Sequence, residues 1–262
     1  MSGTWRLYAD AGNTALKWAV YAGGRWPVEG RIDVEDLAAA GRELAGVLSM
    51  SGFDPVECDG AALVSSRPAQ SRHAEDTLVA ATGQDVLVLG RELQAEIEVA
   101  YHDPAEIGQD RLAAAEGALA LVGAPVIVVT LGTCITAQAL DAEESLVGGA
   151  IAAGLEAQVA GICEAVPHLR KPVREALTSL RAGEDVPAIG RSTAENLALG
   201  LAASVRGTVE ALVAMMCAKT GEAPVLATGG DAELAAALGA SFDRVEPRLV
   251  LEGLRVVDER AR

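Results

Sequence analysis

Short apolar runs alternate with longer amphipathic segments in the first half of the chain. The runs at residues 5–9 and 16–22 are typical of buried strands, and the glycine-containing turn between them predicts a β-hairpin. Apolar spacing predicts the remaining elements in this order: helix 36–50, strand 61–65, helix 69–82, strand 86–89 and the alanine-rich helix 111–121. A further turn is expected at AGGRW, residues 22–26.

The second half repeats this opening pattern. A strand at residues 126–131 leads through LGTCIT to a strand at 137–140, and an acidic turn leads to another strand that enters VGGAIAAG. The later elements are expected as helix 155–165, helix 193–218, strand 225–228 and helix 232–238. The sequence therefore predicts an α/β fold of two related lobes that meet near residue 115, with residues 1–115 in the first lobe and 116–262 in the second.

One uncharged segment, between Glu116 and Asp141, is long enough to cross a bilayer. The tripeptide GAP interrupts it, and a β-branched run followed by GTCIT is typical of a buried strand and a turn. We therefore expect a helix end, a turn and strands here, and no membrane span.

The composition excludes several classes of partner. The 262 residues carry a net charge of −16, from 37 acidic and 21 basic side chains, whereas nucleic acids and anionic membranes select basic surfaces. Aromatic residues make up only 3%, which leaves few rings to stack on bases. The four cysteines are widely spaced without a metal-binding motif, and the N-terminus lacks the pattern of a signal peptide. A cytoplasmic protein that binds neither nucleic acid nor membrane is expected.

The motif DAGNT, residues 10–14, lies at the turn of the predicted hairpin. Gly12 permits close approach of the backbone to a ligand, Asn13 tolerates left-handed geometry and Thr14 adds a hydroxyl. Such a turn can hold a phosphate, although an ordinary hairpin turn accounts for the same residues. Asp10 ends an apolar strand, where a metal ion or its waters explain a carboxylate better than packing does.

A second turn of this kind, GTCIT at residues 132–136, opens the other half of the chain. Two such turns, one in each lobe, suggest a nucleotide held between the lobes with a phosphate contact from each side. A third, TGGDA at residues 228–232, follows another short strand and either approaches the adenosine or caps a helix.

The segment IGQDR places Asp110 and Arg111 at the start of a helix. Spacing alone favours a helix cap with a surface charge for Asp110. The functional alternative is a general base that accepts the proton of an attacking hydroxyl, with the arginine paired to a carboxylate or phosphate. No Walker motif or dinucleotide fingerprint is present, which argues against P-loop kinases and ordinary dehydrogenases.

Seven segments along nearly the whole chain together resemble the type III pantothenate kinases of the actin and sugar-kinase superfamily. In order they are DAGNTALKW, YHDPAEIGQDR, LGTCIT, GGAIAAGLEAQ, GRSTAENLALG, TGGDA and LVLEGL. The resemblance implies two RNase H-like lobes with a nucleotide cleft between them. It also implies ATP-dependent phosphorylation of pantothenate to 4′-phosphopantothenate, the first step of coenzyme A biosynthesis, by a homodimer whose substrate pockets are completed at the dimer interface.

The resemblance further implies roles for individual residues. Asp110 is expected to be the general base on the pantothenate hydroxyl, and Asp10 to hold Mg²⁺ through water. The implied ATP-binding residues are Asp10, Ala11, Gly12, Asn13, Thr14, Ala15, Leu16, Lys17 and Thr133. The implied pantothenate-binding residues are Tyr101, Gly108, Gln109, Asp110, Arg111 and Thr193.

Two positions depart from the family pattern. Thr130 stands where the family usually has an aspartate that binds K⁺ or NH₄⁺, and because a hydroxyl cannot replace a full charge, cation activation is expected to be lost or rebuilt from neighbouring groups. Ala153 replaces a common proline, which is expected to change only loop stiffness. Two alternatives remain open: another small-molecule kinase of the superfamily, such as a sugar or acetate kinase, and a non-catalytic transcriptional accessory protein.

Overall fold

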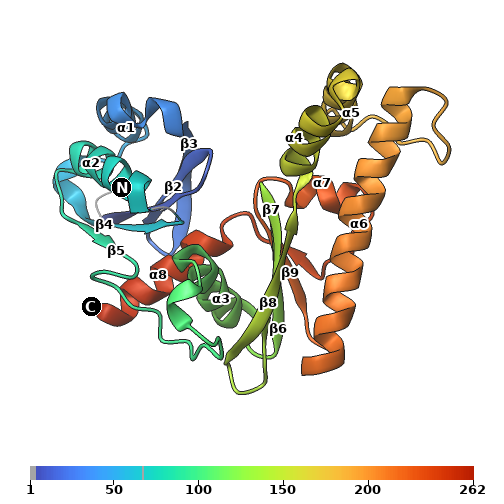
Figure 1. Cartoon of the computed structure of the whole chain (residues 1–262). Coiled ribbons are helices and arrows are strands. Elements are labelled where there is room, and N and C mark those ends of the chain that lie inside the picture. Colours follow the sequence, from blue (N-terminus) through green and yellow to red (C-terminus); the bar gives the residue numbers. More distant parts are fainter. Residues whose placement is uncertain (1–3, 67) are drawn as a thin grey trace. The chain divides into compact units, whose positions relative to one another are not determined.

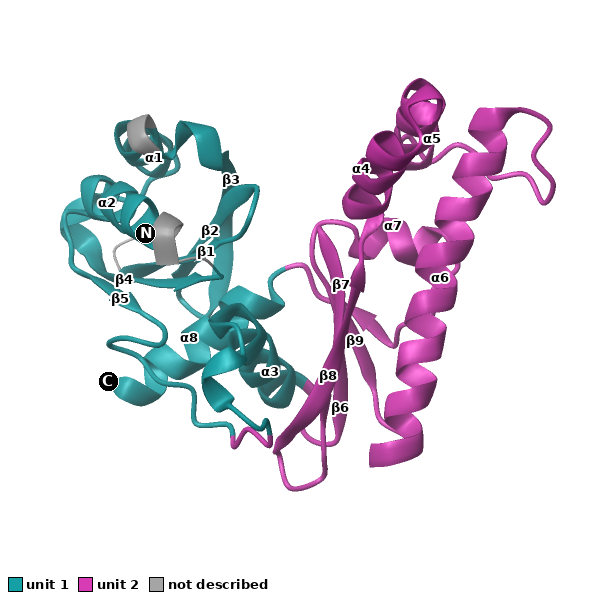
Figure 2. Cartoon of the chain, viewed as in Figure 1, with its two compact units in different colours: residues 1–97, 101–121, 248–262 teal, residues 98–100, 122–247 magenta. Residues whose placement is uncertain are grey.

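The structure is a computed structural model that describes residues 4–66 and 68–262. The chain forms two compact units, which Figure 2 colours separately. Unit 1 comprises residues 1–97, 101–121 and 248–262, and unit 2 comprises residues 98–100 and 122–247. The expected boundary after residue 115 lies inside helix α3 (Gln109–Val122), and the C-terminal helix α8 (Leu249–Ala261) belongs to unit 1.

Unit 1 is built on a five-stranded sheet in the order β3-β2-β1-β4-β5. The strands are β1 (Trp5–Ala11), β2 (Ala15–Ala22), β3 (Arg25–Asp33), β4 (Cys58–Ser65) and β5 (Val86–Val88). The pairs β1–β2 and β2–β3 are antiparallel, whereas β1–β4 and β4–β5 are parallel. The short 3₁₀ helices η1 (Val34–Asp36), η2 (Pro55–Glu57) and η3 (Pro104–Glu106) lie in the connections.

Helices cover both faces of this sheet, which explains why its central strands are buried on both sides. On one face, Leu7 and alternate residues of β1 pack in a core with side chains of α1 (Leu37–Met50) and α2 (Pro68–Thr82). Tyr8, which points to the opposite face, packs in a second core with Ala113 of α3 and Leu254 of α8. The C-terminal helix is therefore an integral part of the first unit.

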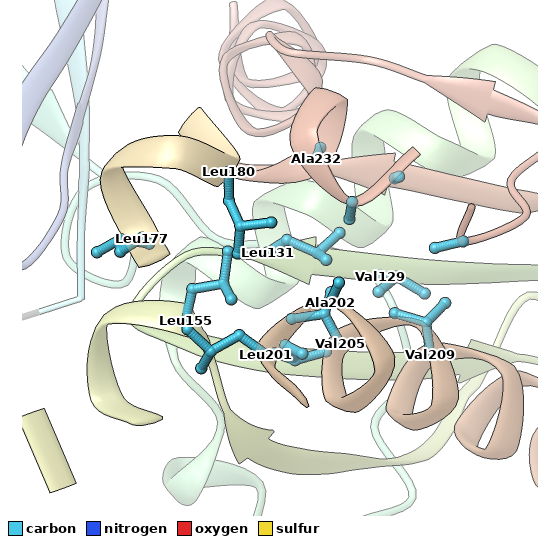
Figure 3. Close-up of a cluster of buried hydrophobic side chains, with 14 of the residues drawn as sticks. Val129, Leu131, Leu155, Leu177, Leu180, Leu201, Ala202, Val205, Val209 and Ala232 are labelled. Carbon is cyan, nitrogen blue, oxygen red and sulfur yellow. The ribbon is translucent and has the colours of Figure 1, made fainter. Parts of the chain in front are cut away.

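Unit 2 contains a second five-stranded sheet in the order β10-β9-β6-β7-β8. Its strands are β6 (Val126–Leu131), β7 (Cys134–Leu140), β8 (Leu146–Ala153), β9 (Val225–Thr228) and β10 (Arg244–Val245). Its helices are α4 (Leu155–Ala165), the 3₁₀ helix η4 (Pro167–Leu169), α5 (Arg170–Arg181), α6 (Thr193–Thr220) and α7 (Ala232–Ala237) (Figure 1). Figure 3 shows the core in which Val129 and Leu131 of β6 meet Leu155, Leu201 and Val205.

The two sheets have the same topology. From its β8 edge, the second sheet has two antiparallel pairs, β8–β7 and β7–β6, followed by two parallel pairs, β6–β9 and β9–β10. The first sheet has the same sequence of antiparallel and parallel pairs when it is followed from its β3 edge. The turn between β1 and β2 therefore corresponds to the turn between β6 and β7. This repeat confirms the prediction of two related α/β lobes.

The uncharged segment between Glu116 and Asp141 forms the end of α3, a turn and strands β6 and β7. This confirms the prediction of a helix end, a turn and strands. Among the described residues, helix α6 is instead the one long and apolar enough to cross a membrane, with a mean hydropathy of 1.5 over an 18-residue window that is 28% buried. A core helix passes the same test, and Leu201, Val205 and Val209 of α6 pack in the core of unit 2. We infer no membrane span from it.

Candidate active site

The turn between β1 and β2 is short and exposes its backbone. Asp10 pairs with Lys17 and Ala11 with Leu16, and the Gly12 N–H donates to the Ala15 carbonyl at 3.0 Å. The next two residues of the turn, Asn13 and Thr14, are exposed. The predicted motif thus forms a tight hairpin turn with little side-chain bulk, which leaves room for a ligand against the backbone.

Asp10 lies near the end of the central strand β1, between Lys17 of β2 and Val64 of β4. Burial and the nearby carboxylate of Asp110 raise the pKa of Asp10 to about 7, and Lys17 opposes this rise. The structure therefore brings together two carboxylates that are 100 positions apart in the sequence. Because like charges repel, an ionised Asp10 near the Asp110 carboxylate favours a cation at this place.

Asp110 lies in the first turn of α3, but it is not the cap of that helix. The Gly108 carbonyl accepts the first hydrogen bonds of α3, from the N–H groups of Arg111 at 3.0 Å and Leu112 at 3.2 Å. The interpretation of Asp110 as a capping residue is therefore wrong. A Cβ on Gly108 would lie 2.5 Å from Oδ1 of Asp110, so a side chain at residue 108 would displace this carboxylate.

Arg111 is held by the loop that precedes α3. Its Nη1 donates to the Tyr101 hydroxyl at 3.4 Å and its Nη2 to the Glu106 carbonyl at 3.2 Å, while its guanidinium carbon lies 6.0 Å from the centre of the Tyr101 ring. The predicted substrate residues 101 and 108–111 thus form one cluster around the start of α3. Gly90 was not predicted as part of this cluster. It has a φ of 87°, and the absence of a side chain there leaves space for Gln109. Its position directly after a predicted strand was the available signal.

Three glycine-containing segments meet at one end of the unit 2 sheet. The Gly154 N–H donates to the Thr133 carbonyl at 3.0 Å, and a Cβ on Gly154 would lie 1.9 Å from the Gly132 carbonyl oxygen. Gly229, which has a φ of 103°, packs closely against Leu131. A Cβ on Gly229 would lie 2.1 Å from the carbonyl oxygen of Leu131. The predicted turns at residues 132–136 and 228–232 are therefore neighbours, and Gly154 is a further member that the sequence analysis did not single out.

Thr130 lies in a row of three threonines. It pairs with Thr136 of β7 and with Thr228 of β9, so the three side chains emerge on the same face of neighbouring strands. Oγ1 of Thr136 is buried and has no hydrogen-bond partner among the residues that the structure describes. Because these hydroxyls carry no charge, the residues do not fit the aspartate-based cation site that the resemblance implies.

Thr193 is the first residue of α6, in unit 2. Two side chains stabilise this helix start: the Glu195 N–H donates to Oγ of the N-cap residue Ser192 at 3.2 Å, and Oε2 of Glu195 accepts from the N–H of Arg191, the residue before the cap, at 2.6 Å. Thr193 itself is exposed. The local structure is explained by helix capping, and the assignment of Thr193 to pantothenate stays a prediction.

The carboxylate pair fits a magnesium ion better than a closed protein metal site. The described residues contain no group of three or more histidine, cysteine, aspartate or glutamate side chains that could hold a metal. Mg²⁺ keeps several waters and is typically bound through one or two carboxylates together with substrate phosphates. Asp10, with Asp110 beside it, supplies that kind of donor set.

Comparison with known proteins identifies the family of the chain. The sequence profile described as type III pantothenate kinase matches residues 6–215. The type III pantothenate kinase of Roseiflexus sp. (strain RS-1) is 31% identical to this chain, over 97% of this chain and 98% of the relative. The type III pantothenate kinase of Thiobacillus denitrificans is 35% identical, over 98% of this chain and 97% of the relative. A solved structure, (R)-2-hydroxyglutaryl-CoA dehydratase component A of Acidaminococcus fermentans, is similar in fold, with a TM-score of 0.60 at 13% identity over 99% of both chains. The fold is the actin-like arrangement of two α/β lobes, and the chain belongs to the type III pantothenate kinase family.

Proposed function

We propose that this protein transfers the γ-phosphoryl group of ATP to the primary hydroxyl of pantothenate and so forms 4′-phosphopantothenate, the first step of coenzyme A biosynthesis. The observation that carries the mechanism is the proximity of the Asp10 and Asp110 carboxylates, at the end of β1 and the start of α3. Family membership supports the choice of substrates.

The ATP phosphates contact the backbone of two equivalent turns in this proposal. One is the segment of residues 10–17 and the other is the turn that contains Thr133. Their equivalent places in the two sheets support a common role, as do the small residues that both contain. Backbone N–H groups in such turns are preorganised donors for the negative charge of phosphates.

Asp10 would hold Mg²⁺ through water, as the family resemblance implies, and the ion would supply charge neutralisation at the phosphates. Asp110 accepts the proton of the pantothenate hydroxyl as its oxygen bonds to the γ-phosphorus and the bond to the ADP oxygen breaks. Arg111, held by Tyr101, pairs with a polar or carboxylate group of pantothenate. The remaining predicted residues, Gly108, Gln109 and Thr193, contribute further substrate contacts.

Activity without a monovalent cation is part of the proposal. The row formed by Thr130, Thr136 and Thr228 supplies hydroxyls where a K⁺ site would need negative charge. We expect this neutral row to need no cation, since it carries no charge for a cation to balance.

A cytoplasmic homodimer is the proposed assembly. The apolar window of α6 is only 28% buried within the chain, and Met215 on this helix is 70% exposed. A second copy that covers α6 would remove this apolar surface from water. Thr193, at the start of the same helix, would then lie near the interface between the copies.

An acceptor panel tests the proposed reaction. Purified protein is incubated with ATP and Mg²⁺, and ADP release is measured with pantothenate, with other hydroxylated acids, with sugars and with acetate. We expect pantothenate to give the highest kcat/KM by a wide margin. A preference for a sugar or for acetate would assign the chain to another kinase activity of the superfamily, and no ADP release with any acceptor would favour the non-catalytic alternative.

A further inference from the structure

Helices α3 and α8 cross in direct backbone contact at two glycines. A Cβ on Gly253 of α8 would lie 1.7 Å from the carbonyl oxygen of Ala113 in α3. In the reciprocal direction, a Cβ on Gly117 of α3 would lie 2.4 Å from the carbonyl oxygen of Leu249 in α8. Both obstacles are backbone atoms, which cannot rotate away as a side chain can. The crossing therefore depends on the absence of side chains at both positions.

Helix α8 is fixed to the sheet of unit 1 by buried polar contacts. The Asp258 carboxylate, which is fully buried, accepts hydrogen bonds from Arg6 Nη2 at 2.8 Å and from the Tyr8 hydroxyl at 2.7 Å, both on β1. Nε1 of Trp26 on β3 donates to Glu252 at 3.1 Å. These contacts make α8 a rigid support for the helix that crosses it.

A second contact holds α3 against this support. Glu116, next to Gly117, is buried, and its carboxylate accepts from Nη1 of Arg260 in α8 at 2.6 Å and from the Glu96 N–H at 2.9 Å. The glycine crossing sets the distance between the helices, and the Glu116 contacts restrict rotation of α3. Asp110 lies in the same helix, one turn before Ala113, so any displacement at the crossing moves its carboxylate.

We propose that Gly117 and Gly253 are positioning residues that set the place of Asp110 through the contact of α3 with α8. This inference rests on the proposed function, because it assigns the glycines a role through the proposed base. To reach an ordinary contact of 3.4 Å, Gly253→Ala requires a displacement of about 1.7 Å and Gly117→Ala one of about 1.0 Å. A misplacement of about 1 Å in a reacting group lowers the rate by on the order of 10²-fold.

The test compares steady-state kinetics with pantothenate for the wild type, Gly117→Ala and Gly253→Ala. The matched control is Gly46→Ala, since Gly46 is an exposed residue of α1 in the same unit and a Cβ there would meet nothing within 4 Å. We expect kcat to fall by about 10²-fold in Gly117→Ala and by more than that in Gly253→Ala, with the KM for ATP within about twofold of the wild type. The control should keep the wild-type kcat. If Gly253→Ala does not fold, Gly117→Ala decides the test.

The same glycine variants in an Asp110→Asn background separate positioning from general destabilisation. If the glycines act through Asp110, their effect on the residual kcat should shrink to less than about threefold, because the group that they position has lost its function. Unchanged kcat in both glycine variants, or an equal loss in the Asp110→Asn background, overturns the inference while leaving the proposed function intact. Absence of wild-type turnover overturns the proposed function and this inference with it.

Discussion

Replacement of Asp10 by asparagine should stabilise the ligand-free protein while removing the group that we propose holds Mg²⁺. The pKa of Asp10 is raised to about 7, first by burial and then by the Asp110 carboxylate. Above pH 7 the wild type therefore folds with an ionised, poorly solvated carboxylate next to a second one. The amide in Asp10→Asn has a similar shape and carries no charge, so this repulsion is absent from the variant.

The magnitude follows from the size of the pKa rise. A rise from 3.8 to about 7 corresponds to roughly 4 kcal/mol of lost stability at pH 8. Because the amide also has a desolvation cost in this position, we expect a net gain of about 2–3 kcal/mol. Below about pH 4 the carboxyl is protonated in both the folded and the unfolded chain, so only the desolvation cost of the amide remains and the variant should be slightly less stable than the wild type. The difference should turn into a gain and grow up to pH 7, because only the unfolded chain releases its proton in that interval.

Urea unfolding between pH 4 and 8.5, without Mg²⁺ or nucleotide, measures this gain. Tryptophan fluorescence reports on unit 1 alone, because Trp5, Trp18 and Trp26 all lie there. The exposed Asp85, in the same unit, provides the control variant Asp85→Asn, for which we expect no pH-dependent gain. A gain in Asp10→Asn that is the same at pH 5 and pH 8, or a loss of stability at pH 8, would refute the electrostatic reasoning.

Three further predictions concern the base, the cation and the support of α8. Asp110→Asn should lower kcat by on the order of 10²-fold or more and leave the Kd for ATP nearly unchanged in calorimetry; unchanged turnover would remove Asp110 from its role. Turnover should be the same in Na⁺ and K⁺ buffers because Thr130 offers no charge, and a strong, saturable response to K⁺ or NH₄⁺ would contradict this. Asp258→Ala should cost about 3–5 kcal/mol in urea unfolding, since it removes what is, among the described residues, the closest and only fully buried carboxylate partner of the buried Arg6, and a loss below about 1 kcal/mol would show that the network is not a stabilising one.

Most elements could be predicted because buried strands and core helices carry continuous or periodic apolar patterns. Strand β3 was missed, since it is an edge strand with alternating exposed residues such as Arg25 and Arg31 and with Pro27 in its sequence. Helix α5 was also missed, although the buried residues Val173, Leu177 and Leu180 lie at helical spacing. Charged neighbours and a nearby proline concealed this pattern.

The position of the C-terminal helix could not be predicted from local patterns. Asp258 looks like a surface residue in the sequence, and its partner Arg6 is 252 positions away. Local spacing likewise favoured a cap for Asp110, because nothing near residue 110 indicates that Asp10 lies beside it. The resemblance to a family supplied a role for each of the two residues but not their proximity, and these roles stay predictions until they are tested.

Mass spectrometry of the reaction products detects the proposed phosphoryl transfer itself. Wild-type protein and Asp110→Asn are incubated separately with ATP, Mg²⁺ and pantothenate, and 4′-phosphopantothenate is quantified over time. The account predicts that the wild type accumulates this product in step with ADP and that the variant forms it at least about 10²-fold more slowly. ADP formation by the wild type without 4′-phosphopantothenate, or equal product from both proteins, would contradict it.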